Sequence, residues 1–255
     1  MSQFGNLYSQ YYDLLYQDKD YQAEEKYVSS LIQNYMPKAH SLLDLGCGTG
    51  KHAELFCDRG LFVHGVDLSL EMLNIAEKRR IGKENQLSFS HSSIQNLSLD
   101  KRFDVITSLF HVMSYQNSNQ ELIQALEVAK DHLVDDGILI FDFWYGPAVL
   151  TERPTTRIKR LENDLIKVTR LAEPILHPQI NCVDVHYNIF IRDKFKNNIF
   201  VEKKELHQMR YLFDTELELI CEQVGFQVLD KYEWMSNKSP SFNSWNVVWI
   251  LKNSI

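Results

Sequence analysis

The sequence predicts an α/β fold in which helices cover both faces of a mostly parallel sheet, with a small antiparallel insertion. Short apolar runs typical of buried strands alternate with segments of helical periodicity over the first 150 residues. The first run, residues 41–45, leads directly into a turn that carries three glycines. Over residues 151–210 apolar and polar residues alternate instead, which indicates an antiparallel sheet.

Each expected element of the first segment has its own local signal. In chain order, the elements are a strand over 41–45, a helix over 51–59, a strand over 62–67, a helix over 70–78, a strand that ends near 90, a strand over 103–110, a helix over 119–133 and a strand over 138–143. Ser69 is the expected N-cap of the second helix, and residues 135–137 form a turn before the last strand.

Helical periodicity returns after the insertion, over residues 214–223. Thr215 and Glu218 there occupy the positions of a capping box, and Gly225 provides a C-terminal stop. The last two strands, expected over 226–232 and 245–251, form an antiparallel hairpin. The sheet therefore has seven strands.

These elements predict one domain with an insertion. Residues 1–150 and 211–255 form the sheet domain, and residues 1–40 form a helical cap over its site. The insertion, residues 151–210, leaves the sheet at the edge where α/β proteins bind ligands, so we expect a substrate lid. It holds 12 lysines and arginines against 8 aspartates and glutamates, although the whole chain carries a net charge of -7. This contrast predicts an anionic group on the substrate.

The glycine turn predicts a site for a nucleoside that also carries a positive charge. Glycines at 46, 48 and 50 let the backbone approach a ligand without an intervening Cβ. A dinucleotide pyrophosphate would need a third small residue where this chain has Lys51, and Asp44 would repel it. The sulfonium and ammonium of S-adenosylmethionine (SAM) suit that carboxylate. Asp67 ends the next strand at the spacing expected of an acid that accepts hydrogen bonds from ribose hydroxyls.

The run from Asp44 to Gly50, D-x-G-x-G-x-G, resembles the first motif of class I SAM-dependent methyltransferases. The resemblance implies SAM as cofactor, S-adenosylhomocysteine as product, and a Rossmann-like sheet. In the family an acid often stands where this chain has Ser93, so Ile94 is the firmer adenine contact. The cofactor contacts expected on these grounds are Tyr16, Tyr21, Asp44, Gly46, Cys47, Gly48, Gly50, Asp67, Leu68, Met72, Ser93, Ile94 and Leu109.

A tyrosine-rich N-terminal segment extends the resemblance. Residues 12–16 (YDLLY) and 19–21 (KDY) look like the opening of the methyltransferases that N,N-dimethylate nucleotide-linked 3-amino sugars of the desosamine and mycaminose type. The similarity continues through residues 143–145 and 185–187. It implies an amine acceptor, with Trp144, Tyr145 and His186 as the substrate contacts.

Two features of this chain depart from the amino-sugar enzymes. Those enzymes tend to have a histidine where this chain has Tyr115, and their last strand lacks the tryptophan-rich run of residues 245–249. Both departures concern the acceptor, so a small-molecule O-methyltransferase and a non-catalytic SAM-binding regulator stay open. An aminopropyltransferase is disfavoured because its polyamine pocket must be acidic, whereas the insertion is basic.

The candidate catalytic residues are Tyr12, His111 and Tyr115. An amine acceptor needs only to arrive unprotonated, whereas an alcohol needs a base, which His111 or Tyr115 after the fourth strand would supply. Tyr12 belongs to the segment whose aromatic rings are expected to cover the sulfonium and exclude water from it.

Composition excludes several other classes. The acidic net charge of -7 argues against a nucleic-acid substrate. No apolar run reaches the length of a membrane span and the chain begins without a leader pattern, so we expect a cytoplasmic protein without a membrane partner. Four cysteines without metal-ligand spacing predict reduced thiols and no metal. The expected protein is a monomer or homodimer that acts on a small molecule.

Overall fold

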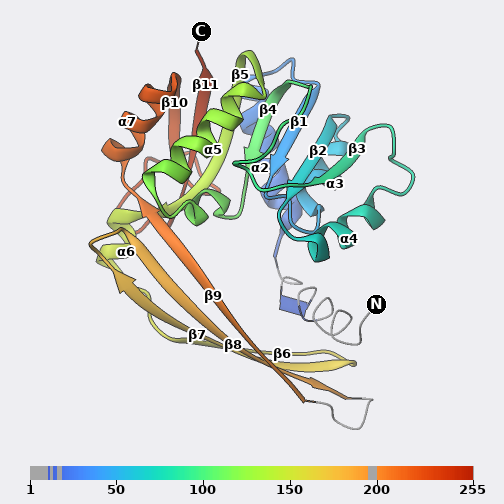
Figure 1. The fold of residues 1–255 in the computed structure, drawn as a ribbon, viewed down its shortest axis with the longest axis vertical. Coiled ribbons are helices and arrows are strands. Elements are labelled where there is room, and N and C mark those ends of the chain that lie inside the picture. Colours follow the sequence, from blue (N-terminus) through green and yellow to red (C-terminus); the bar gives the residue numbers. More distant parts are fainter. Residues whose placement is uncertain (1–10, 12–13, 16–18, 195–199, 255) are drawn as a thin grey trace. The chain divides into compact units, whose positions relative to one another are not determined.

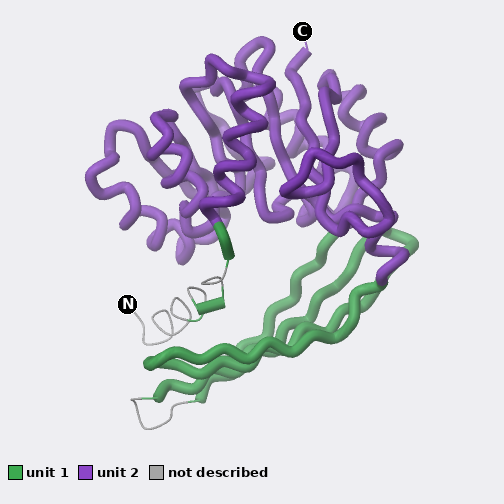
Figure 2. Tube along the Cα trace, turned by 180° about the vertical axis from the view of Figure 1, so that it is seen from behind, with its two compact units in different colours: residues 1–20, 153–209 green, residues 21–152, 210–255 purple. Residues whose placement is uncertain are grey.

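The computed structural model describes residues 11, 14–15, 19–194 and 200–254 (Figure 1). Its contacts divide the chain into two compact units (Figure 2). We call Tyr21–Glu152 with Arg210–Ile255 the α/β unit, and Met1–Asp20 with Arg153–Met209 the β unit. Among the described residues, no helix is long and apolar enough to cross a membrane.

The α/β unit is built on the expected seven-stranded sheet. Its strand order is β3 (Leu87–His91), β2 (Phe62–Asp67), β1 (Ser41–Leu45), β4 (Phe103–Ser108), β5 (Leu133–Tyr145), β11 (Asn246–Asn253) and β10 (Phe226–Glu233). The first five strands are parallel, and β11 is antiparallel to both β5 and β10. The final hairpin and the predicted α/β class are therefore confirmed.

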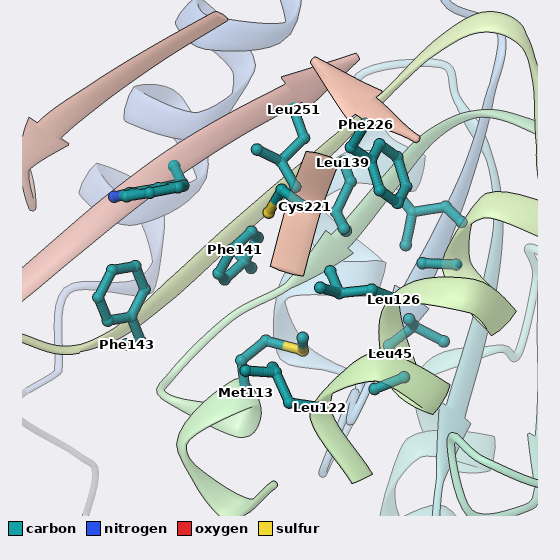
Figure 3. Packing of buried hydrophobic residues seen from close by; sticks show 14 of the residues in the cluster. Leu45, Met113, Leu122, Leu126, Leu139, Phe141, Phe143, Cys221, Phe226 and Leu251 are labelled. Carbon is teal, nitrogen blue, oxygen red and sulfur yellow. The ribbon is translucent and has the colours of Figure 1, made fainter. Parts of the chain in front are cut away.

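Helices pack on both faces of this sheet because each buried strand is apolar on both sides. The helices are α2 (Tyr21–Tyr35), α3 (Lys51–Asp58), α4 (Leu70–Arg79), the 3₁₀ helix η1 (Val112–Tyr115), α5 (Asn119–Asp131), α6 (Gly146–Thr151) and α7 (Asp214–Val224). Along β5, Leu139 and Phe141 join the cluster formed with α5 and α7 (Figure 3). Ile138 and Ile140 alternate with them and join the cluster formed with α2 and α3.

Several expectations about local structure were wrong. β4 ends at Ser108 rather than at residue 110, and α5 ends at Asp131 rather than at residue 133. β5 begins at Leu133, so the segment expected as a turn belongs to the strand; Asp136 there has a φ of 63°, and the register with β4 shifts between Phe103 and Val105. The capping box at Thr215 does not form, because α7 already begins at Asp214 and its N-cap, Phe213, makes no side-chain cap. Ser69 caps α4 as expected, with its side chain accepting from the backbone N–H of Met72.

The β unit contains the insertion, in which β7 pairs antiparallel with both β6 and β8. Its strands are β6 (Arg157–Glu162), β7 (Ile166–His177), β8 (Cys182–Asp193) and β9 (Phe200–Leu212), in that order. Tyr11, Leu14 and Leu15 pack with Ile166 and Ile191 in the core of this unit. β9 continues into the α/β unit, where Tyr211 and Leu212 pair with Trp144 and Tyr145 at the end of β5.

Candidate cofactor site

The site begins with the turn between β1 and α3, where the backbone is left-handed at three positions. Gly46, Gly48 and Gly50 have φ values of 77°, 54° and 71°. The N–H groups of Gly46 and Cys47 both donate to the carbonyl of Val66 on β2, at 2.8 and 3.0 Å. The turn is thereby held against the neighbouring strand.

The three glycines differ in what surrounds them. A Cβ on Gly46 would lie 2.5 Å from Cγ2 of Val112, and a Cβ on Gly50 would lie 2.8 Å from Cζ of Phe89. A Cβ on Gly48 would meet nothing within 4 Å. The outer glycines are therefore required by packing, whereas the middle one leaves its backbone open to a ligand.

Asp67 links this open backbone to the end of β2. Its Oδ2 accepts a hydrogen bond of 2.8 Å from the N–H of Gly48, and its Oδ1 accepts one of 2.8 Å from the N–H of Ser69. Each carboxylate oxygen can accept a second hydrogen bond, so the pair retains acceptors for two hydroxyl groups. This geometry fits the ribose role expected from the sequence.

Asp44 provides a buried negative charge beneath the turn. The residue is 2% exposed, and its Oδ1 accepts a hydrogen bond of 2.9 Å from the hydroxyl of Thr107. Burial is the largest cause that raises the pKa of Asp44 to about 6, and the nearby charge of Asp67 raises it further. His52 acts in the opposite direction. A cationic ligand next to this carboxylate would favour its ionised form.

The structure adds two residues that the sequence did not single out. Nε2 of His52 on α3 lies 2.9 Å from Oε2 of Glu24 on α2. The ring of Tyr21 packs edge-on against His52, with ring centroids 5.0 Å apart. Tyr21, an expected cofactor contact, therefore packs on the histidine that lowers the pKa of Asp44. The available signal was a histidine on the buried face of the helix that follows the glycine turn.

The loop after β4 packs against the glycine turn. Val112 forms the close neighbour of Gly46 there. His111 precedes it, and its Nδ1 lies 2.7 Å from Oδ2 of Asp142 on β5. The backbone N–H of His111 donates to Oδ1 of the same carboxylate at 3.2 Å. Tyr115, the other candidate base, is 43% exposed.

The expected acceptor contacts have different surroundings. Trp144 lies edge-on to Trp245, with ring centroids 5.4 Å apart, and its centroid is 6.3 Å from that of His111. The hydroxyl of Tyr145 donates to Oδ2 of Asp214 at 3.1 Å, and burial raises the pKa of Tyr145 to about 12. Trp144 therefore lies beside His111, whereas the hydroxyl of Tyr145 is hydrogen-bonded to the first residue of α7.

The remaining expected cofactor contacts vary in exposure. Leu68 follows Asp67 and is 69% exposed, whereas Ile94 and Leu109 are buried in the two cores of the α/β unit. Met72 is anchored through Ser69, and the hydroxyl of Ser93 accepts from the N–H of Asn96 at 3.3 Å. Burial raises the pKa of the Cys47 thiol well above its usual range, so a neutral thiol lines the turn.

The last three expected site residues are His186, Tyr12 and Tyr16. His186 belongs to the β unit, where it lines a cavity of about 630 Å³ together with Tyr187 and Lys204. Tyr12 and Tyr16 lie outside the described residues. Within the described part of the chain, no cluster of three or more histidine, cysteine or acidic side chains could hold a metal ion.

Comparison with known proteins identifies this arrangement. A family model described as a methyltransferase domain matches residues 42–137. The dTDP-3-amino-3,6-dideoxy-alpha-D-glucopyranose N,N-dimethyltransferase of Streptomyces fradiae is 32% identical over 178 residues, which cover 69% of this chain and 68% of that protein. The chain belongs to the class I SAM-dependent methyltransferases. Its cofactor is SAM.

A further relative and a solved structure extend the similarity over most of the chain. The dTDP-3-amino-3,4,6-trideoxy-alpha-D-glucopyranose N,N-dimethyltransferase of Streptomyces venezuelae is 27% identical, covering 85% of this chain and 89% of that protein. The solved structure of a SAM-dependent methyltransferase from Clostridium acetobutylicum has a TM-score of 0.83 at 23% identity, covering 98% of this chain and 99% of that one. The Rossmann-like fold of the methyltransferase is thereby confirmed.

Proposed function

We propose that this methyltransferase transfers methyl groups to the amino group of a nucleotide-linked amino sugar. The observation that carries the proposal is the similarity to two proteins named as dTDP-amino-sugar N,N-dimethyltransferases, at 32% and 27% identity. The aromatic wall of Trp144 and Trp245 beside His111 supports it, because apolar rings exclude water from an amine that must react unprotonated.

The proposed cofactor contacts follow from the geometry of the turn. Asp67 would accept hydrogen bonds from the ribose hydroxyls, while the backbone of Gly48 lies open beside it. Asp44 would balance the positive charge of the cofactor from beneath the turn. When bound, SAM supplies a methyl group already activated by a sulfonium leaving group. The residues of the chain then have to align the acceptor and keep water out.

We also propose that the acceptor is anionic and that the enzyme works in the cytoplasm as a monomer or homodimer. The basic composition of residues 151–210 supports an anionic handle, such as the diphosphate of a nucleotide sugar. All four cysteines lie in described residues as free thiols, which suits a reducing compartment. Competition by free dTDP against the acceptor would test the anionic handle.

A second candidate function, O-methylation of a small molecule, is favoured by one observation. His111 lies against Asp142, and a histidine oriented by a carboxylate is a suitable base for an alcohol. The two functions differ in the acceptor atom, so matched acceptors separate them.

The experiment uses methyl-labelled SAM and pairs of dTDP-sugars that differ in one group. In each pair, an amino group at C3 or C4 of the sugar is replaced by a hydroxyl, and free amino acids and simple phenols complete the panel. We expect label in the amino sugars, with one or two methyl groups by mass spectrometry, and none in the hydroxyl partners. Transfer confined to hydroxyl acceptors would sink the amine proposal. The variant D58N, changed at an exposed carboxylate paired with Lys83, serves as the control enzyme.

A further inference from the structure

Both carboxylate oxygens of Asp142 contact His111. Oδ1 accepts the backbone N–H of His111 at 3.2 Å, and Oδ2 lies 2.7 Å from its Nδ1. Asp142 is 1% exposed within β5, where its neighbours along the strand are Phe141 and Phe143. A carboxylate buried in an apolar strand is costly unless it is paired, so this contact explains how an acid is accommodated there.

The loop that brings His111 to this carboxylate has a strained backbone. Phe110 and His111 have φ values of 65° and 64°, in the left-handed region that non-glycine residues rarely adopt. Each such residue costs about 1 kcal/mol or more, so two in succession need compensation from their surroundings. The carbonyl of His111 accepts from the N–H of Ser114 at 2.9 Å, and the hydroxyl of Ser114 accepts from the N–H of Trp144 at 3.0 Å. The loop is therefore held in place by β5.

The position of His111 places it within the site. The next residue, Val112, packs on Gly46 of the cofactor turn, and Trp144 of the proposed acceptor wall lies on the other side of the histidine. Nδ1 is buried 2.7 Å from Oδ2 of Asp142, at an angle that does not make a regular hydrogen bond. Because 16% of the side chain is exposed, the exposed fraction belongs to the rest of the ring and its stem. The rings packed on it, Phe110 and Trp144, carry no charge.

We propose that Asp142 is a positioning residue that keeps the Nδ1 proton on neutral His111, so that Nε2 accepts the proton of the acceptor amine. A carboxylate beside one ring nitrogen favours the tautomer protonated there and leaves the lone pair on the other. The inference rests on the proposed N-methylation. Aliphatic ammonium groups, with pKa values near those of lysine, about 10.4, are charged at neutral pH.

The proton step balances within the chain and the acceptor. The N–H bond of the acceptor ammonium breaks, its electron pair stays on nitrogen, and the proton forms a bond with Nε2. The resulting imidazolium is stabilised by Asp142 and later releases the proton to solvent. Because each methylation of an amine leaves a new ammonium, an enzyme that adds two methyl groups needs this step before each transfer.

Asp142→Asn reverses the expected tautomer for a geometric reason. The oxygen of the new amide must take the place of Oδ1, because the backbone N–H of His111 points there. Its NH₂ group then faces Nδ1 and can only donate, which moves the ring proton to Nε2. D142N should therefore lack the proton acceptor while it retains the shape of the site.

The test is nitrogen NMR of histidine-labelled enzyme without acceptor, which reports the tautomer directly, with H111Q to assign the signal. We expect wild type and the remote control D58N to carry the proton on Nδ1, and D142N to carry it on Nε2. We expect kcat of D142N to fall about 100-fold near neutral pH. The deficit should shrink as pH rises and the acceptor loses its proton unaided, while SAM affinity stays within about twofold.

Two results would overturn the inference. Wild-type enzyme with the proton on Nε2 would do so even if D142N failed to fold, and so would an unchanged tautomer and pH profile in a folded D142N. The proposed function fails separately: with the Nδ1 tautomer observed in wild type but no amino sugar methylated, the proposed acceptor is wrong and the pairing of Asp142 with His111 still holds.

Discussion

The backbone N–H of Gly48 donates a 2.8 Å hydrogen bond to Oδ2 of Asp67, which joins the turn after β1 to the end of β2. The same carboxylate accepts from Ser69, the N-cap of α4. One side chain thus shapes the open backbone of the candidate cofactor site and also provides the acceptors proposed for the ribose. Its removal should affect cofactor binding through both routes.

Asp67→Asn should lower the affinity for SAM about 10- to 100-fold. The amide keeps one oxygen but loses the charge and one acceptor, and a hydrogen bond to a charged group contributes about 1.5–3 kcal/mol. Calorimetric titration measures the change. D58N, altered at an exposed carboxylate paired with Lys83, should bind as wild type does. An affinity of D67N within twofold of wild type would remove Asp67 from the proposed contacts.

The raised pKa of Asp44 predicts that SAM binding weakens in mild acid. Its pKa is raised to about 6, so the free enzyme takes up a proton there as pH falls, and the cationic cofactor must then displace that proton. We expect affinity to be flat above about pH 7 and about tenfold lower at pH 5. Asp44→Asn should bind weakly at every pH and lose this dependence. A pH slope that persists in D44N would assign it to another group.

The same pKa predicts that Asp44 lowers the stability of the free enzyme at neutral pH. A carboxyl whose folded pKa lies above its unfolded value contributes stability below the unfolded pKa, and this contribution is lost as pH rises through about 6. Asp44→Asn keeps an oxygen for the hydroxyl of Thr107 and carries no charge. Its free energy of unfolding by urea should exceed that of wild type by about 2–3 kcal/mol at pH 8 and by less at pH 5. A less stable D44N at pH 8 would contradict this.

The parts of the fold that could be predicted are those with local signals. β1 and β2 have the predicted bounds, because each is an apolar run closed by a turn signal. The insertion was predicted only as an antiparallel sheet over 151–210. β6, an edge strand that pairs with β7 and is largely exposed, has no signal of its own that marks its bounds. The start of β5 was missed because a left-handed Asp136 lets residues of turn composition stay in the strand.

The candidate site divides in the same way. The glycine turn and Asp67 could be found from their spacing in the sequence, because the left-handed turn requires glycines at fixed positions. The role of Asp142 could not be found in this way, because it is a single acid in an apolar strand. Nothing local shows that His111, in the loop after β4, lies against it. The pairing of His52 with Glu24 likewise depends on how α2 and α3 pack. Sequence patterns report which face is buried but do not report which polar side chains meet across elements.

Glycine substitutions should separate packing from ligand access. Gly48→Ala and Gly82→Ala both place a Cβ in open space at left-handed φ values of 54° and 81°, so each should lose about 1 kcal/mol of stability. G48A should in addition lose at least tenfold in SAM affinity, because its Cβ projects where the ligand approaches. Thermal melts with and without SAM measure both effects. Equal SAM binding by G48A and G82A would show that the ligand does not approach Gly48.

Replacement of Lys130 on α5 should lower the stability of the protein and leave the candidate cofactor site unchanged. Its Nζ donates to the carbonyls of Val224 and Gly225, both at 3.0 Å, where α7 ends and the helix dipole is negative. Lys130→Met retains most of the apolar stem but removes these charge-assisted bonds, so the free energy of unfolding should fall by about 1–3 kcal/mol. Urea unfolding measures this, with Lys38→Met at an exposed position as the control. SAM affinity of K130M should equal that of wild type, and a variant as stable as K38M would show that α7 does not depend on this contact.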